Sequence, residues 1–91
     1  MPSAKASKKR VNFLLHAPGA REVYVAGSFN DWDPTARPLK RGKDDEWRTW
    51  MNLAPGTHEY QFVVDGEWRE DPSCSERRPS PYGSHNSVVE L

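Results

Sequence analysis

Two tryptophans lie among polar residues at turns, where a ring of that size gains little from burial. Trp32 falls in the stretch GSFNDWDP at 27–34, and Trp68 follows DGE at 65–67. A pyranose ring has an apolar face of C–H bonds and a rim of hydroxyls. An aromatic ring can stack on that face while amide and hydroxyl groups bind the rim. The residues therefore favour a sugar-stacking surface, and the alternative is that Trp32 folds back to cap one end of the domain.

Four carboxylates near Trp68 raise the possibility of glycoside hydrolysis, which needs two carboxyl groups facing each other across a cleft. They are Asp65, Glu67, Glu70 and Asp71. However, Asp-Gly at 65–66 is a turn signature, and a shallow β surface offers no cleft that would exclude water or raise the pKa of one acid. We therefore predict that the domain is not an enzyme.

The remaining reactive side chains do not form a recognisable metal or cofactor site. His16, His58, His85 and the single Cys74 lack metal-ligand spacing, and we expect His58 to be a hydrogen-bonded core residue. Phosphate-binding glycine loops and the Gly-x-Ser-x-Gly nucleophile elbow are absent from the sequence. We expect neither a cofactor nor a metal.

The charge of the chain is unevenly distributed. Residues 1–10, MPSAKASKKR, hold four of the thirteen basic residues and no acid, and we expect a flexible basic tail. Residues 11–91 keep nine basic residues against thirteen acidic ones, a net charge near −4 with histidine neutral. That balance disfavours nucleic acid, whose phosphates require clustered Lys and Arg. No apolar segment suits a signal peptide or a membrane span, so we expect a cytoplasmic protein that does not enter membranes.

The elements that must position these residues are short strands. Alternating or β-branched runs are separated by Gly, Pro, Asn and Asp, and no run has a helical period. Strands are predicted at 11–17, 22–29, 37–41, 46–53, 58–65 and 85–91. This spacing predicts one all-β domain over 11–91, a small sandwich or barrel.

The most clearly predicted strand pair joins 46–53 to 58–65 across the APGT loop, with Leu53 opposite His58. This pairing would place Trp50 on the outer face beside Gln61. Alternation also selects the side chains that face the core. They are Phe13, Leu15, Val23, Val25, Trp47, Tyr60, Phe62 and Val64.

Three stretches in this order resemble the glycogen-binding carbohydrate module of the AMP-activated protein kinase β subunit. They are VYVAGSFNDWDP, EWRTWMNLAPGTHEYQFVVDGEWREDP and YGSHNSVVEL, and the likeness runs over residues 11–91. A related module precedes the catalytic domain of isoamylases and branching enzymes. The resemblance implies an immunoglobulin-like (early-set) β-sandwich that binds α-1,4-linked glucans such as glycogen, starch, maltooligosaccharides or cyclodextrin.

The resemblance also assigns residues to the glucan site, residue by residue. It implies that Trp32 and Trp68 stack on glucose rings, with Asn86 and Ser84 as hydroxyl contacts. Gln61 stands where the family has a lysine, and it keeps an amide that both donates and accepts. Tyr82 stands where the family has a leucine, which enlarges the side chain that probes the sugar. For Trp50, predicted beside Gln61, we hypothesise that it widens the sugar platform; the alternatives are a covering strand or a protein contact.

The implied partners are an α-glucan and a kinase or glucan-active enzyme acting in trans. The alternative function is a protein-interaction or scaffolding domain that keeps the sandwich without binding glucan. Loss of the stacking tryptophans would mark that alternative, and both Trp32 and Trp68 are present.

Overall fold

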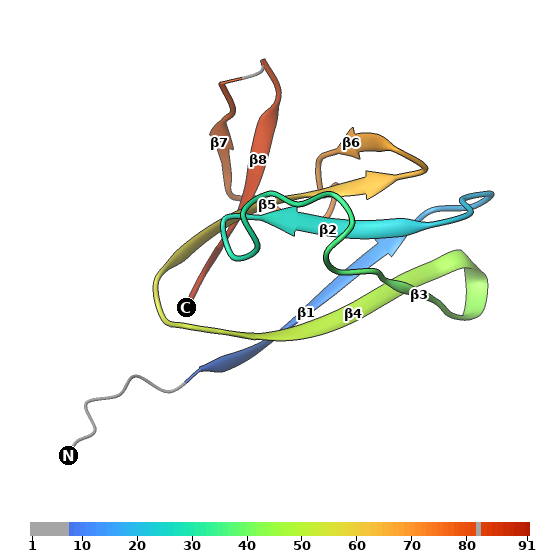
Figure 1. The fold of residues 1–91 in the computed structure, drawn as a ribbon, viewed down its shortest axis with the longest axis horizontal. Coiled ribbons are helices and arrows are strands. Elements are labelled where there is room, and N and C mark those ends of the chain that lie inside the picture. Colours follow the sequence, from blue (N-terminus) through green and yellow to red (C-terminus); the bar gives the residue numbers. More distant parts are fainter. Residues whose placement is uncertain (1–7, 82) are drawn as a thin grey trace.

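The structure is a computed structural model that describes residues 8–81 and 83–91, and it consists of two antiparallel sheets packed face to face (Figure 1). The first sheet has the order β1-β4-β3, with bounds Lys9–His16, Glu46–Leu53 and Lys40–Arg41. The second has the order β2-β5-β8-β7, with bounds Val23–Gly27, Thr57–Val64, His85–Glu90 and Arg77–Pro79. β6 (Glu67–Arg69) also pairs with β5, and the short 3₁₀ helix η1 (Lys43–Asp45) joins β3 to β4. The predicted all-β, immunoglobulin-like sandwich is confirmed.

The core lies between the two sheets, where the inward-facing side chains of alternating strands meet. All eight predicted core residues are buried, so this prediction is confirmed. Phe13 and Tyr60 meet edge to face with ring centroids 5.0 Å apart, and Tyr60 and Phe62 do so at 5.8 Å. No helix in the described residues is long and apolar enough to cross a membrane.

The predicted hairpin between the fourth and fifth strands is wrong. β4 pairs with β1 and β3, whereas β5 pairs with β2, β6 and β8 in the other sheet. The 54–56 connection instead crosses from one sheet to the other, and Gly56 exchanges two backbone hydrogen bonds of 2.9 Å with Leu91. The alternating pattern identifies the face of each strand that points to the core. It is the same whether the two strands form a hairpin or lie in opposite sheets, so it could not distinguish the two arrangements.

Several strand limits also differ from the prediction. β1 begins at Lys9, so Lys9 and Arg10 pair with β4 and do not belong to the predicted tail. Residues 1–7 of that tail lie outside the described residues. The strand expected at 37–41 is reduced to two residues, and β6 and β7 were not predicted because each has only three residues.

β5 is the central strand of the sandwich. β2 runs along one of its edges, while the other edge is divided between two strands. β8 pairs with residues 57–60 and β6 with residues 62–64. Gln61 therefore lies where one neighbouring strand ends and the next begins, on the outward face of the sheet.

Candidate functional site

The loop after β2 holds Trp32 through the side chain of Asn30. Asn30 Oδ1 accepts the N–H of Gly27 at 3.0 Å, and Asn30 Nδ2 donates to the carbonyl of Val25 at 3.2 Å. The N–H of Trp32 donates to the carbonyl of Gly27 at 2.9 Å. Asp31 and Trp32 have φ of 56° and 57°, a left-handed conformation that turns the chain sharply. These contacts explain Gly27 and Asn30 in the sequence GSFNDW, because both residues secure the turn that carries the ring.

Gly27 is required at the end of β2 by a close approach of two backbones. A Cβ at this position would lie 2.3 Å from the carbonyl oxygen of Glu59 and 2.7 Å from the ring of Phe29. Ser28 then extends the pairing with β5, since its N–H donates to the Glu59 carbonyl at 2.9 Å and its hydroxyl accepts the Glu59 N–H at 3.1 Å. The Trp32 loop is thereby fixed against the middle of β5.

The second tryptophan is carried by β6. Trp68 pairs with Val63 of β5 and is 47% exposed. Its ring centroid lies 6.4 Å from that of Trp32, with 45° between the planes. Trp32 is half-buried in this pair and lies outside the core cluster. Two large rings thus stand together on the outer face of the five-stranded sheet.

A chain of amide and hydroxyl groups lies beside the rings. Gln61 Nε2 lies 2.8 Å from Asn86 Oδ1, 3.1 Å from Ser84 Oγ and 3.3 Å from the carbonyl oxygen of His85. Asn86 Nδ2 donates to Glu59 Oε1 at 3.1 Å, and Glu59 is 3.8 Å from the guanidinium of Arg78. Gln61 and Asn86 are buried, so these bonds fix the orientation of both amides.

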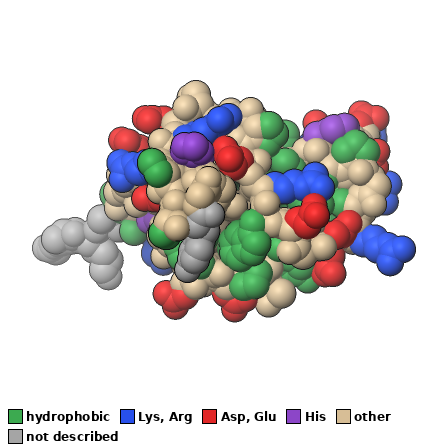
Figure 2. Space-filling model, turned by 90° about the horizontal axis from the view of Figure 1, so that it is seen from above, with side chains coloured by type: hydrophobic (Ala, Val, Ile, Leu, Met, Phe, Trp, Pro, Cys, Tyr) green, Lys and Arg blue, Asp and Glu red, His purple; other side chains and the backbone are tan. Residues whose placement is uncertain are grey.

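The rings and the amides enclose one hollow of about 910 Å³. It is lined by Trp32, Glu59, Gln61, Trp68, Ser80, Pro81, Ser84 and Asn86. Figure 2 shows a group of hydrophobic side chains on the outer surface, with charged groups around them. The structure therefore brings together five of the seven predicted site residues. Tyr82 lies outside the described residues.

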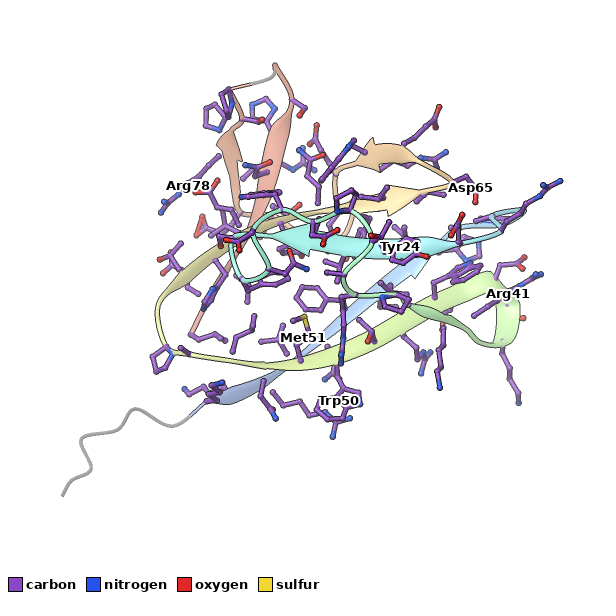
Figure 3. The ribbon with its side chains drawn as sticks, in the orientation of Figure 1. Tyr24, Arg41, Trp50, Met51, Asp65 and Arg78 are labelled. Carbon is purple, nitrogen blue, oxygen red and sulfur yellow. The ribbon has the colours of Figure 1, made fainter. Side chains whose placement is uncertain are left out.

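Trp50 is not part of this hollow, and its predicted position beside Gln61 is wrong. It lies on the outer face of the three-stranded sheet, opposite Asn12 of β1 (Figure 3). The ring is 45% exposed, and the guanidinium carbon of Arg10 lies 4.4 Å from its centroid. Alternation correctly predicted that Trp50 faces outward. However, Trp50 lies in the three-stranded sheet, whereas Gln61 lies in the five-stranded sheet.

Three lining residues were not predicted as site residues. Glu59 has the same parity as Gln61 on β5, so alternation places both on the outer face and could have identified it. Ser80 and Pro81 follow β7 in a segment without a periodic pattern, and no sequence signal marks them.

The chemistry available in the hollow is that of hydroxyl recognition. Amide groups and serine hydroxyls donate and accept, the Glu59 carboxylate accepts, and the two indole rings offer flat apolar faces. In residues 8–81 and 83–91, no group of three or more His, Cys, Asp or Glu could hold a metal ion. These groups suit a neutral polyhydroxylated ligand.

The fold and the hollow are those of a carbohydrate-binding β-sandwich module. Residues 11–91 match the family model described as the glycogen recognition site of AMP-activated protein kinase. The chain belongs to this family, as the sequence motifs indicated.

Similar proteins agree with this assignment. The chain is 37% identical over 73 residues to subunit beta-1 of 5'-AMP-activated protein kinase from Sus scrofa, covering 80% of this chain and 57% of that protein. It is 44% identical over 64 residues to subunit beta-2 from Rattus norvegicus, covering 70% of this chain and 23% of that protein. The chain thus spans less than two thirds of the curated relatives. A maltogenic amylase from S. marinus shares the fold, with a TM-score of 0.79 and 23% identity over 96% of this chain and 14% of the amylase.

Proposed function

We propose that this domain binds α-1,4-linked glucans, such as glycogen, starch, maltooligosaccharides and cyclodextrin, without catalysing a reaction. The observation that carries the proposal is the pair of tryptophan rings with centroids 6.4 Å apart beside a row of fixed amides. Trp32 and Trp68 stack on the apolar faces of glucose residues. Gln61, Asn86 and Ser84 bind the hydroxyl rim, and the resemblance adds Tyr82 to this set.

The expected affinity is modest. Stacking contributes about 0.5 to 1.5 kcal/mol per ring beyond area burial. Hydrogen bonds contribute about 1 kcal/mol each, and the entropy of association opposes both. The dissociation constant for a short glucan should therefore lie roughly between micromolar and millimolar.

The charge around the hollow supports a neutral ligand. Glu59 is the charged residue among those that line the hollow, and its Oε2 lies 3.8 Å from Nη1 of Arg78. A carboxylate accepts hydrogen bonds from sugar hydroxyls but repels a phosphate. An uncharged glucan fits these groups better than a phosphorylated one.

Calorimetric titration with β-cyclodextrin and maltoheptaose tests the proposal directly, together with retention on glycogen. The double variant Trp32→Ala/Trp68→Ala should lose detectable binding while it stays folded. Trp50→Ala is the matched control, because Trp50 and Trp68 are exposed to nearly the same extent, 45% and 47%, on opposite sheets. This control should bind like the wild type, and the absence of glucan binding by folded wild type would refute the proposal.

A protein-interaction domain is the second candidate function. It is favoured by the outer face of the three-stranded sheet, where Leu14 and Trp50 are both 45% exposed. The curated relatives are named as subunits of a kinase, so a kinase or a glucan-active enzyme in trans is the partner class that we propose for such a surface. Folded protein that binds no glucan would favour this second function.

A further inference from the structure

A second hollow, of about 250 Å³, lies beside Trp68. Its walls come from β2, β5, β6 and the loop after Trp32. The residues that matter here are Glu22, Tyr24, Pro34, Thr35, Val63 and Trp68. None of them except Trp68 lines the larger hollow.

The register of the sheet explains why the two hollows meet at Trp68. Tyr24 of β2 pairs with Val63 of β5, and Val63 pairs with Trp68 of β6 on its other side. Directly paired residues point to the same face, so these three side chains form one row across the outer surface. The 28–35 loop lies along this row, with Trp32 toward the larger hollow and Pro34 and Thr35 toward the smaller one.

The smaller hollow repeats the chemistry of the larger one. It has two aromatic side chains, and its polar groups are a phenol, a hydroxyl and a carboxylate. The Tyr24 hydroxyl donates to Glu22 Oε1 at 3.0 Å, and the Thr35 hydroxyl donates to Asp33 Oδ1 at 3.1 Å. Both oxygens keep lone pairs that can accept from a sugar hydroxyl. The bond to Glu22 also raises the pKa of Tyr24.

We propose that this second hollow is an additional glucose subsite, reached by a glucan chain that crosses Trp68 from the larger hollow. The inference rests on the proposed function, and it deepens it by making chain length a determinant of affinity. A short oligosaccharide fills the larger hollow alone. A longer one also contacts the Tyr24 ring, with its hydroxyls near Glu22 and Thr35.

The test compares maltotriose with maltoheptaose for wild type, Tyr24→Ala and Glu22→Ala, using calorimetry and backbone amide NMR shifts. Each variant should weaken maltoheptaose binding, Tyr24→Ala by roughly 3- to 10-fold, and leave maltotriose binding unchanged. In the wild type, the amides of Glu22 and Thr35 should shift with maltoheptaose but not with maltotriose. Glu22→Ala removes an exposed side chain and keeps the ring, so it remains informative if Tyr24→Ala does not fold.

The outcomes separate this inference from the proposed function. If the wild type binds maltoheptaose, both variants bind it with the same affinity, and the wild-type amides of Glu22 and Thr35 do not shift, the second subsite is overturned. Glucan binding by the larger hollow is then unaffected. Wild type that binds neither oligosaccharide would overturn both. Trp50→Ala serves again as the control on the opposite sheet and should behave like wild type.

Discussion

Trp32 adopts a backbone conformation that is unfavourable for a residue with a large side chain. Its φ of 57° follows a φ of 56° at Asp31, and each such residue costs about 1 to 3 kcal/mol. The hydrogen bonds of Asn30 and the Trp32 N–H compensate for part of that cost. Strained residues cluster at functional sites, and this one holds the indole ring in the wall of the hollow that Gln61 and Asn86 also line, which agrees with the stacking role that we propose for it.

Replacement of Trp68 alone should separate binding from stability. Trp68→Ala should abolish detectable glucan binding because one of the two stacking faces is lost. The melting temperature should fall by no more than a few degrees, because the ring is 47% exposed on a three-residue strand. Calorimetry and thermal unfolding on the same preparation measure both effects. A large loss of stability with retained binding would show that the ring serves packing.

Asp65 makes folding sensitive to acid. Its Oδ1 accepts the N–H groups of Glu22 at 3.0 Å and Arg21 at 2.9 Å, and these bonds lower the pKa of Asp65 below the ordinary value of 3.8. The folded state therefore gains stability above about pH 4, and this gain is lost as the pH falls through the lowered pKa.

Asp65→Asn should flatten this acid dependence of stability. Asparagine keeps an oxygen that accepts both N–H groups, and it tolerates the φ of 49° at this position. The free energy of unfolding, measured by urea denaturation from pH 6 to pH 2.5, should fall less in the variant than in the wild type. Parallel curves for the two proteins would contradict this role of the carboxylate.

At the scale of elements, the contact between β2 and β5 depends on the missing side chain of Gly27. Gly27→Ala places a Cβ 2.3 Å from the Glu59 carbonyl oxygen and forces the strands apart. We expect a loss of about 1 to 3 kcal/mol or more in the free energy of unfolding. Glucan binding should weaken as well, because the Trp32 loop begins at this contact.

Gly42→Ala is the control for this prediction. The nearest atom to its added Cβ lies at 3.4 Å, and the φ of Gly42 is −112°, which any residue can adopt. Urea denaturation should find Gly42→Ala close to the wild type. Equal effects of the two substitutions would exclude steric contact at Gly27 as the cause.

The sequence predicts which face of a strand is buried more reliably than it predicts which strands pair with one another. Alternation predicted every assigned core residue, from Phe13 to Val64, because burial alone decides which side of a strand is apolar. The partner of β4 was missed because APGT reads as a hairpin turn, while the chain uses it to cross between sheets. Trp50 was consequently assigned to the wrong sheet.

The candidate site was predictable where a motif or parity marks a residue. Trp32, Trp68, Gln61, Ser84 and Asn86 line the larger hollow as a group. Ser80 and Pro81 could not be predicted, since they enter through the placement of the β7–β8 hairpin, which depends on tertiary pairing.

At the scale of the whole molecule, two buried hydrogen bonds of Asp71 tie the 70–74 segment to the core. The Tyr60 hydroxyl donates to Asp71 Oδ2 at 2.6 Å, and the Asp71 N–H donates to the hydroxyl of fully buried Ser87. Burial, followed by the bond to Asp71, raises the pKa of Tyr60 above its ordinary value of 10.0. The folded state thus requires a neutral phenol. Its stabilisation is complete below about pH 10 and is lost as the pH rises further.

Tyr60→Phe should destabilise the domain by about 1 to 3 kcal/mol at neutral pH, because the Asp71 carboxylate loses a buried donor. It should also reduce the loss of stability between pH 9 and pH 11. Thermal unfolding over this range measures both effects. Tyr24→Phe is the comparison. The pKa of Tyr24 is also raised by its bond to Glu22, but this bond lies at the surface, so the variant should change the loss of stability at high pH less than Tyr60→Phe does. If Tyr60→Phe loses as much stability as the wild type between pH 9 and pH 11, the prediction is contradicted.

β5 and the short strands β6 and β7 should open on different time scales. β5 is paired along both edges and its second half is buried on both faces, so its amide hydrogens should exchange with solvent mainly through global unfolding. β6 and β7 are three exposed residues each, and their amides should exchange through local opening. The proposed glucan surface should therefore combine a floor that opens only when the whole domain unfolds with walls that open locally, so that the walls can adjust to a bound chain without disturbing the core.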